Sequence, residues 1–305
     1  MRKSFTEIYG GIEAGGTKFV CAIGSGPKDM RERIQFATTT PAETIGKAGD
    51  FLKQCHSRQA LTAIGIASFG PLDLNTKSPT YGYIINTPKA GWADVNMPGM
   101  IRDALDIPIV IDTDVNSAAL AEQKWGAAQR LNSFIYLTVG TGIGGGGIIN
   151  GQLMHGLVHP EMGHIRLPHD LFLDPFPGSC PFHGDCWEGL ASGASIEKRW
   201  GKRSQEIPAD HPAWELEAGY LALGVTNLIY ALSPQRIILG GGVMKNPGLL
   251  PAIRSKVGVL LNGYLSSEAI IGRIGDFLVS PQLGDISGVL GAIALARQFK
   301  KNNSQ

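Results

Sequence analysis

The sequence predicts an α/β protein made of two similar halves. Two observations lead to this prediction. A strand-like run, a glycine-rich turn and a second strand-like run occur at residues 8–24 and again at residues 134–149, and strand and helix patterns alternate between these two hairpins. At 305 residues, with 43% hydrophobic and 17% charged residues, the chain is long enough to bury a large core and to form two domains.

The second hairpin reads FIYLTVGTGIGGGGII at residues 134–149, two strand-like runs joined by a turn that is almost entirely glycine. Glycine lets the backbone adopt positive φ and lets a ligand approach without a Cβ in the way. Successive N–H groups in such a turn form a concavity that attracts anions, above all phosphate. A tight hairpin with only a packing role is the alternative.

The first hairpin, IYGGIEAGGTKFVCAIG at residues 8–24, repeats the pattern with Gly15, Gly16 and Thr17 in its turn. Two such hairpins suggest two halves that close on one nucleotide. Other glycine motifs fit less well. Residues 16–18 read Gly-Thr-Lys, whereas a P-loop needs Gly-Lys followed by Ser or Thr. Residues 144–147 are all glycine, so they cannot readily open the helix that a dinucleotide fingerprint requires.

The remaining elements follow from composition and periodicity. Between the hairpins we expect, in order, a strand at 33–38, a helix at 42–54, a buried strand at 60–69, a helix at 97–105, a strand at 107–111 and a helix beginning near 116. After the second hairpin we expect helices at 194–201 and 214–231, strands at 236–239 and 277–279, and a closing helix at 288–299. The expected domains are residues 1–115, on which the closing helix could pack, and residues 116–305.

Charge and hydropathy exclude several classes of function. The net charge is +1, and no cluster of Lys or Arg is longer than a pair, so nothing favours nucleic acid or an anionic membrane as a partner. No apolar run approaches the roughly 20 residues of a membrane span, and the N-terminus lacks a signal-peptide core. We therefore expect a cytoplasmic protein.

Two carboxylates end a strand-like run in the segment DTDVN, residues 112–116. Functional side chains tend to lie where a strand ends and a loop or helix begins. A carboxylate at Asp114 could take a proton from a hydroxyl group as that group attacks the γ-phosphoryl group of ATP. The alternative is a helix N-cap, with Asp114 or Asn116 accepting the first free helical N–H groups. Asp112 is compatible with either role.

Cys180, His183 and Cys186 follow one another at intervals of three in CPFHGDC. Tetrahedral zinc needs a fourth ligand. Four histidines are near in the sequence: His155, His159, His164 and His169. Residues 155–190 can bury little apolar surface, so a structural metal would supply the order of this segment. A disulfide is not expected in a reducing cytoplasm, and two unrelated thiols beside a surface histidine are the alternative.

Two further groups of residues could bind ligands. Glu161 and Glu188 flank the metal segment, and such carboxylates can accept hydrogen bonds from several hydroxyl groups of a sugar. They could equally be ordinary surface glutamates. Gly240, Gly241 and Gly242 follow a short buried strand and would let an adenine or ribose approach the backbone. A plain turn into a helix is the alternative there.

Together these segments resemble the ROK family of sugar kinases and repressors, and more narrowly its bacterial fructokinase branch. The resemblance covers nearly the whole chain. Its motifs are GGIEAGGTK at 10–18, DTDVNSAALAE at 112–122, VGTGIGGG at 139–146, HPEMGHI at 159–165, CPFHGDCWEG at 180–189 and LGGGVM at 239–244. The family implies an actin-like ATPase fold, which is ribonuclease H-like and duplicated, with a zinc-ordered loop and, as partners, a hexose, Mg²⁺-ATP and a second copy of the chain.

The motifs and the resemblance together define the expected site. Asp114 is the expected catalytic base. The ATP-binding residues are Gly15, Gly16, Thr17, Lys18, Thr141, Gly142, Gly240, Gly241 and Gly242. The sugar-binding residues are Lys89, Asn116, Glu161, His164 and Glu188. The ligands of a structural Zn²⁺ are His164, Cys180, His183 and Cys186, where His164 is chosen because the family has a ligand there.

The chain departs from the family pattern at a few positions. Glu13 stands where most members have aspartate, and Cys180 with His183 replaces a common Cys-x-Cys pair. Lys89, in TPKAGW, stands where glucokinase-like members tend to have asparagine, which favours the fructokinase branch. An exposed loop lysine with no function is the alternative.

The family resemblance leaves a choice between kinase and repressor. Repressors carry a helix-turn-helix ahead of the kinase fold, whereas here the first hairpin begins at about residue 8 and the charge is near neutral. The sequence therefore predicts a kinase that converts fructose to fructose 6-phosphate. A kinase for mannose, glucose or an N-acetylhexosamine, and a catalytically idle sugar-sensing protein, are the alternatives.

Overall fold

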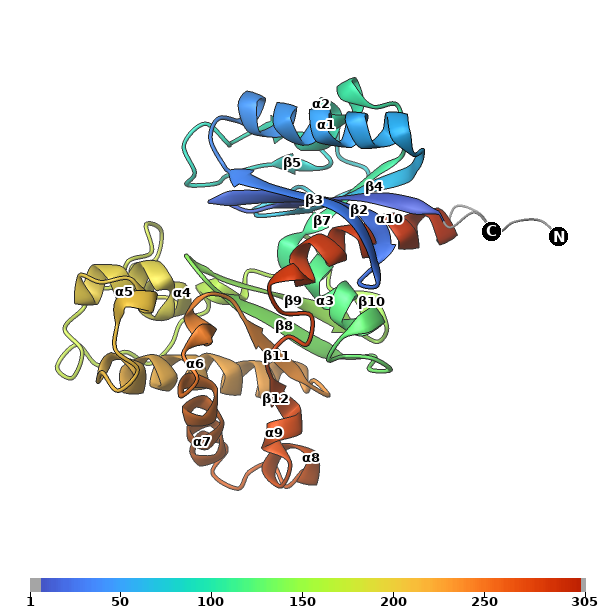
Figure 1. Ribbon diagram of the computed structural model, residues 1–305. Helices are drawn as coiled ribbons and strands as arrows, with labels where there is room; N and C mark the ends of the chain where they lie inside the picture. The colour runs from blue at the N-terminus through green and yellow to red at the C-terminus, as the bar shows by residue number, and fades with distance from the viewer. Residues whose placement is uncertain (1–6, 303–305) are drawn as a thin grey trace. The chain divides into compact units, whose positions relative to one another are not determined.

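The structure is a computed structural model that describes residues 7–302 (Figure 1). The chain divides into two compact units. The first comprises Met1–Gln129, Leu153–Pro160 and Asp285–Gln305, and the second comprises Arg130–Gln152 and Glu161–Gly284. Each unit contains a five-stranded sheet, and each sheet begins with an antiparallel hairpin.

The sheet of the first unit has the strand order β3-β2-β1-β4-β7. The strands are β1 (Ile8–Ala14), β2 (Lys18–Gly26), β3 (Asp29–Ala37), β4 (Leu61–Ser68) and β7 (Ile109–Thr113). β1 pairs antiparallel with β2 and parallel with β4, and β4 pairs parallel with β7. A separate two-stranded sheet joins β5 (Tyr83–Ile84) to β6 (Val95–Asn96).

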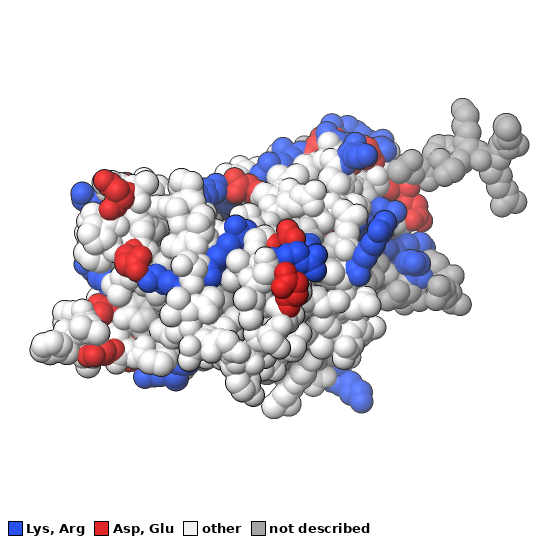
Figure 2. Space-filling model, turned by 90° about the horizontal axis from the view of Figure 1, so that it is seen from below, with Lys and Arg blue, Asp and Glu red and all other residues white. Residues whose placement is uncertain are grey.

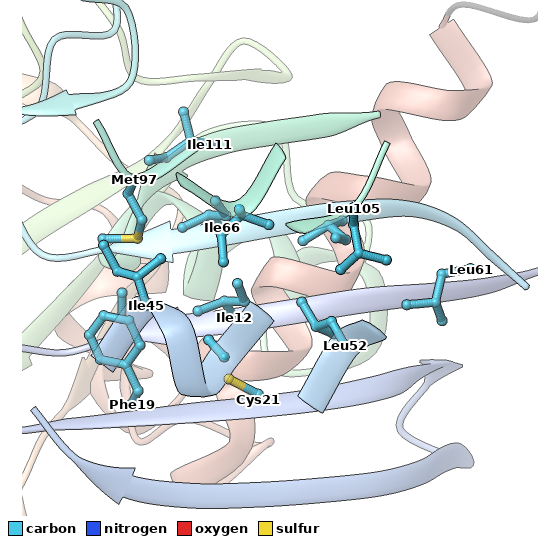
Figure 3. Close-up of a cluster of buried hydrophobic side chains, with 14 of the residues drawn as sticks. Ile12, Phe19, Cys21, Ile45, Leu52, Leu61, Ile66, Met97, Leu105 and Ile111 are labelled. Carbon is cyan, nitrogen blue, oxygen red and sulfur yellow. The ribbon is translucent and has the colours of Figure 1, made fainter. Parts of the chain in front are cut away.

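Helices cover both faces of this sheet (Figure 1). α1 (Pro41–Arg58) and α2 (Met97–Ala104) lie on one face, and α10 (Ser287–Asn302) lies on the other. Beneath α1 and α2 is the larger apolar core, in which Leu52 of α1 and Met97 of α2 meet Ile12 and Ile66 of the sheet (Figure 3). Cys21 lies in this core as a small apolar residue.

α10 covers a second apolar cluster on the opposite face, where Val289 and Ile293 pack against Tyr9, Val20 and neighbouring strand residues. α3 (Asp114–Trp125) packs along α10. The first unit therefore extends past the expected boundary at residue 115, because α3 and the later segment 153–160 cluster with the first sheet.

The sheet of the second unit repeats the first, with the order β10-β9-β8-β11-β12. Its strands are β8 (Phe134–Val139), β9 (Ile143–Ile149), β10 (Gln152–Leu153), β11 (Ile237–Gly240) and β12 (Leu278–Val279). β8 pairs antiparallel with β9 and parallel with β11, and β11 pairs parallel with β12. This repetition of order and direction confirms the duplicated α/β fold expected from the two glycine-rich hairpins.

The helices of the second unit follow its strands. They are α4 (Trp187–Ala191), α5 (Gly193–Trp200), α6 (Ala213–Leu232), α7 (Leu249–Leu261), α8 (Glu268–Ile271) and α9 (Ile274–Phe277), with short 3₁₀ turns η1 (Met162–His164), η2 (Ser204–Glu206) and η3 (Val243–Lys245). A fourth turn, η4 (Gly284–Ile286), precedes α10. α6 packs against α7 and α4.

Charged side chains and helix hydropathy characterise the described part of the chain. On the face shown in Figure 2, acidic and basic side chains are interspersed and form no patch of a single sign. Among the residues from 7 to 302, no helix is both long enough and apolar enough to cross a membrane.

Candidate active site and metal centre

The turn between β1 and β2 holds the first expected phosphate loop. The N–H of Gly15 donates to the carbonyl of Lys18 at 3.0 Å, and the hydroxyl of Thr38 donates to the carbonyl of Gly15 at 2.7 Å. A Cβ placed on Gly16 would meet nothing within 4 Å, and Gly16, Thr17 and Lys18 are exposed. Hydrogen bonds thus hold the base of the turn, and its tip is exposed to solvent.

Strand register places Asp114 at the same sheet edge as this turn. Ala14 of β1 pairs with Ser68 of β4, and Ser68 pairs with Thr113 of β7. All three strands run parallel, so their carboxyl ends share one edge, where ligands of α/β proteins usually bind. The backbone of Asp114 therefore lies about 10 Å, the width of two strand spacings, from the start of the phosphate turn.

Asp114 is the first residue of α3 and is half-buried, so it does not point into the hydrophobic interior. Its Oδ1 accepts a hydrogen bond from the N–H of Val115 at 2.9 Å. The N-cap of α3 is Thr113, whose hydroxyl accepts from the N–H of Asn116 at 3.2 Å. An N-cap role for Asp114 or Asn116 is therefore excluded, and the helix begins two residues earlier than expected.

Asn116, for which a sugar-binding role is expected, makes its side-chain contacts inside the protein. Its side chain is fully buried. Its amide group donates to Oδ1 of Asp112 at 3.0 Å and to the carbonyl of Met154 at 3.1 Å. Both amide hydrogens are thus used inside the protein, where Asn116 fastens Asp112 and residue 154 to α3, and its expected sugar contact stays a prediction.

Asp112 is buried at the end of β7, with 4% of its surface exposed. Besides Asn116, its Oδ1 accepts from the N–H of Thr113 at 2.7 Å, and its Oδ2 lies 2.8 Å from Nε2 of His155. The His155 side chain is 45% exposed. The hydrogen bond to Asp112 raises the pKa of His155, and partial burial opposes that rise.

A second histidine fastens the same segment beside β4. Nε2 of His159 accepts a hydrogen bond from the N–H of Leu72 at 2.9 Å. His159 is 6% exposed, and burial lowers its pKa. Leu72 also forms a β-bridge to Ile84 of β5. Lys89 lies five residues beyond that strand in a turn where its carbonyl accepts from the N–H of Trp92 at 3.1 Å, and it is half-buried.

In the second unit, the β8–β9 turn is the second expected phosphate loop. A Cβ on Gly140 would meet nothing within 4 Å, as at Gly16 in the first turn. The carbonyls of Gly140 and Thr141 accept from the first N–H groups of α5 at 2.7 and 3.2 Å. At the other side of the turn, Oε2 of Glu188 accepts from the N–H of Ile143 at 2.8 Å and leaves no room for a Cβ on Gly142.

The glycine triplet at residues 240–242 lies at the same edge of the second sheet. Gly240 of β11 pairs with Thr138 of the neighbouring β8. Gly241 has φ +98°, and a Cβ there would overlap the carbonyl oxygen of Val139. Glycine is required at this position, because only glycine adopts this backbone conformation without strain and allows such close packing.

Three expected sugar ligands lie together in the second unit. The pKa of Glu161 is raised mainly because protein removes water from its carboxylate; the charge of Glu188 adds to the rise and that of His164 opposes it. Glu161 is thus within electrostatic range of His164 and Glu188, and Glu188 contacts the second phosphate loop.

The four expected metal ligands converge. His164, Cys180, His183 and Cys186 offer ligand atoms that all lie within 4.8 Å of one another. Nδ1 of His164 is 3.3 Å from Nδ1 of His183, 3.5 Å from Sγ of Cys186 and 3.8 Å from Sγ of Cys180. With zinc–ligand bonds of about 2.0–2.3 Å, tetrahedral ligand atoms lie about 3.3–3.8 Å apart. The donor set and its spacing therefore fit zinc.

The backbone around the cluster is held by local pairing. Cys180 and Gly184 exchange two backbone hydrogen bonds, at 3.0 and 3.1 Å, and Gly184 has φ +64°. Outside the cluster, His169 lies with Nδ1 3.2 Å from the Asp185 carboxylate and Nε2 3.0 Å from the carbonyl of Asp174. His155, His159 and His169, which the sequence left open as ligands, thus bind other groups.

The structure also identifies residues that sequence reasoning missed. The pairing of His155 with Asp112 was not anticipated, because 43 residues separate the two. Glu13 is largely buried beside α10, where a Cβ on Gly288 would touch its carboxyl group. In the part of the chain that the structure describes, its Oε2 has no hydrogen-bond partner. Burial raises the pKa of Glu13, and Lys18 and Arg33 oppose the rise. The unusual glutamate in the first phosphate motif was the only sequence signal for this.

The duplicated sheets, each with a glycine-rich hairpin at its carboxyl edge, define the fold of actin-like sugar kinases. The ROK family model matches residues 9–299, and the chain belongs to the ROK family. Among solved structures, a ROK hexokinase from Thermus thermophilus is 25% identical with a TM-score of 0.76, over 97% of this chain and 99% of that one. A ROK glucokinase from Streptomyces griseus, solved with glucose and AMPPNP, is 24% identical with a TM-score of 0.77, over 95% and 99%.

Sequence relatives of known name are more similar than these structures. A fructokinase from Zymomonas mobilis is 46% identical over 301 residues, which is 96% of this chain and 98% of that protein. A fructokinase from Lactococcus lactis is 47% identical over 257 residues, 84% of this chain and 86% of that protein. A fructokinase from Streptococcus mutans is 42% identical over 96% of this chain and 99% of that protein.

Proposed function

We propose that this protein is an ATP-dependent fructokinase, which transfers the γ-phosphoryl group of ATP to fructose and releases fructose 6-phosphate. The observation that carries the proposal is the identity of 42–47% to several fructokinases over most of the chain. At the sheet edge of the first unit, Asp114 provides a half-exposed carboxylate at the start of a helix, as proton removal from a hydroxyl group requires.

The ATP phosphates are assigned to the two glycine-rich turns. In the first unit the contacts are Gly15, Gly16, Thr17 and Lys18, and in the second unit they are Thr141 and Gly142. Gly240, Gly241 and Gly242 lie beside the second turn and would border the adenosine. Mg²⁺ bound to ATP would neutralise charge on the transferred phosphoryl group. Lys18 is exposed at the start of β2, and its ammonium group is assigned to a phosphate oxygen.

The sugar is assigned to Glu161, His164 and Glu188, with Lys89 as the residue that distinguishes the fructokinase branch. The carboxylates accept hydrogen bonds from sugar hydroxyl groups. A structural Zn²⁺ held by His164, Cys180, His183 and Cys186 would fix the segment between the two glutamates, with no open position for water. The thiolate ligands require reducing conditions, which supports a cytoplasmic location, and the family resemblance supports a homodimer.

The decisive experiment is the Asp114→Asn variant in a coupled assay of ADP release. Loss of the carboxylate should lower kcat by about 10² to 10⁴, while fructose binding measured by calorimetry stays near that of the wild type. Asp103→Asn is the matched control, because Asp103 is an exposed aspartate on α2 of the same unit. An Asp114→Asn variant with near-normal kcat would remove Asp114 from the mechanism.

A panel of hexoses in the same assay tests the choice of acceptor. Fructose should give the highest kcat/KM among fructose, mannose, glucose and N-acetylhexosamines. Preference for another hexose would support the proposed kinase activity but would show that fructose is not its substrate. Fructose binding without ADP release from any hexose would instead show a sugar-sensing protein and refute the kinase.

A further inference from the structure

The carboxyl edge of the first sheet holds a histidine–carboxylate pair that the proposed mechanism does not use. Nε2 of His155 lies 2.8 Å from Oδ2 of Asp112, the last but one residue of β7. Asp114, the proposed base, follows two residues later. The carboxylate is buried and the imidazole is half-exposed. A fixed, buried anion thus holds an exposed ring at the edge where the acceptor sugar must approach Asp114.

The carboxylate itself is buried, and both of its oxygens already bind protein groups. Its Oδ1 accepts from the N–H of Thr113 and from the amide of Asn116, and its Oδ2 faces His155. Any contact with a ligand must therefore come from the imidazole. With Nε2 turned to Asp112, Nδ1 is the remaining ring nitrogen, and it makes no hydrogen bond within residues 7–302.

The segment that carries His155 is fastened on both sides of this residue. The carbonyl of Met154 accepts from the amide of Asn116 at 3.1 Å, and His159 accepts from the N–H of Leu72 at 2.9 Å. The first contact lies at the start of α3 and the second in the loop after β4. His155 is therefore held across the carboxyl ends of β4 and β7, which is the preorganisation that a binding group needs.

We propose that His155 is a sugar-binding residue, whose Nδ1–H donates a hydrogen bond to a hydroxyl oxygen of the hexose. The inference rests on the proposed kinase function and deepens it. The carboxylate of Asp114, at the same sheet edge as His155, can only accept hydrogen bonds, so a sugar oxygen beside it that accepts a hydrogen bond needs a different side chain as donor. Paired with Asp112, a protonated His155 supplies that donor, and its raised pKa keeps it protonated to higher pH than an isolated histidine.

Other titratable groups lie around the pair. Asp112 comes from β7, and His159 comes from the same segment as His155. Tyr81, in the turn before β5, faces Asp112, and its pKa is raised by burial and by the charge of that carboxylate. His159 is held neutral by burial, so the pH dependence of sugar binding through this pair should follow His155.

The test is the His155→Gln variant, assayed with fructose and ATP varied separately. Loss of a charged donor should raise KM for fructose about ten- to hundredfold and leave KM for ATP unchanged. The ratio of wild-type to variant kcat/KM for fructose should shrink as pH rises from about 6 to about 9, because the wild type loses the donor proton and glutamine does not. His155→Asn, which shortens the side chain, should show the same split.

The matched control is His56→Gln. His56 is also a half-buried histidine of the first unit, but its Nδ1 accepts from the N–H of Leu61 at the amino end of β4. This variant should leave both KM values unchanged. An unaltered KM for fructose in His155→Gln, a parallel rise in both KM values, or a kinetic ratio that grows with pH would each overturn the inference.

Failure of the kinase proposal is distinguishable from failure of this inference. If the wild-type protein releases no ADP with any hexose, the kinase proposal fails, and fructose binding by calorimetry then tests His155 directly. His155→Gln should weaken that binding about ten- to hundredfold. Equal affinities of wild type and variant would refute the role of His155.

Discussion

Glu217 lies on α6 with 2% of its surface exposed, and its Oε1 has no hydrogen-bond partner within the described residues 7–302. Burial raises its pKa well above the ordinary value, while the charge of Arg199 opposes the rise. The folded protein therefore binds a proton at this carboxyl group more readily than the unfolded chain does. Stability from this group is complete below the unfolded pKa and is lost as pH rises from there towards the folded pKa.

Glu217→Gln should therefore raise the melting temperature, and the increase should be larger at pH 8 than at pH 5. The amide has the size of the protonated carboxyl group but cannot ionise. Differential scanning calorimetry across this pH range would measure the effect. Glu215→Gln, an exposed change on the same helix, should give a small difference at either pH. An equal shift at both pH values would show that Glu217 is not the titrating group.

At this scale the sequence was informative where a motif marks a residue directly. Spacing marked Cys180, His183 and Cys186, and composition marked the two glycine-rich turns. The family resemblance added His164, and the structure brings the four metal ligands together. Asn116 shows the limit. Its place in DTDVN marked it as functional, but only the fold reveals that its amide faces Asp112 and Met154. Contacts between distant residues, such as Asp112 with His155, leave no local signal.

Among the secondary-structure elements, β4 and α10 pack so closely that one glycine decides their contact. A Cβ on Gly65 would overlap the carbonyl oxygen of Ala292. Gly65→Ala should lower the free energy of unfolding by about 1–3 kcal/mol, since overpacking forces the helix away from the sheet. Gly46→Ala is the control, because Gly46 is exposed on α1 and a Cβ there meets nothing within 4 Å.

Urea unfolding of both variants would measure these effects. Gly46→Ala should be neutral or stabilising by up to about 1 kcal/mol, because alanine favours the helix. A Gly65→Ala protein as stable as the wild type would mean that α10 can shift without cost. The same close approach explains why the closing helix belongs to the first unit although it ends the chain.

The zinc segment makes a separate prediction. Removing metal with a chelator should make residues 155–190 sensitive to protease, and added zinc should restore resistance, because this segment has few regular elements to hold it. Cys180→Ser should lower the zinc content measured by mass spectrometry. Phe182→Ala should not, since Phe182 lies between two ligands but is 56% exposed and offers no donor atom. Equal protease resistance with and without metal would contradict a structural role.

Elements with a clear apolar pattern were predicted within a few residues, as for β8 and α6. The pattern failed at α7, which the sequence did not suggest. Pro251 lies in its first turn and Gly258 in its interior, and both residues weaken a helix signal. Tertiary packing against α6 compensates for these weak local preferences. The short strands β5, β6 and β10 also carry too few residues for a periodic signal.

For the whole molecule, the duplication was the most predictable property. Each half contains the same glycine-rich hairpin in its sequence, and the strand orders of the two sheets have the same pattern. The boundaries between the units were less predictable, because the first unit is assembled from three separate stretches of chain. The amino-acid composition changes little at the points where the chain passes from one unit to the other. Only packing, such as that of α3 along α10, determines which sheet a segment joins.

The covering of the first sheet by the last helix has a consequence for biosynthesis. A ribosome releases α10 only after every strand it covers has left the exit tunnel. Until then Tyr9, Val20, Ala22 and Ala63 present an apolar face to water. The nascent chain therefore exposes this apolar face through most of translation. Truncated products that end before residue 287 should be bound by chaperones or degraded by proteases.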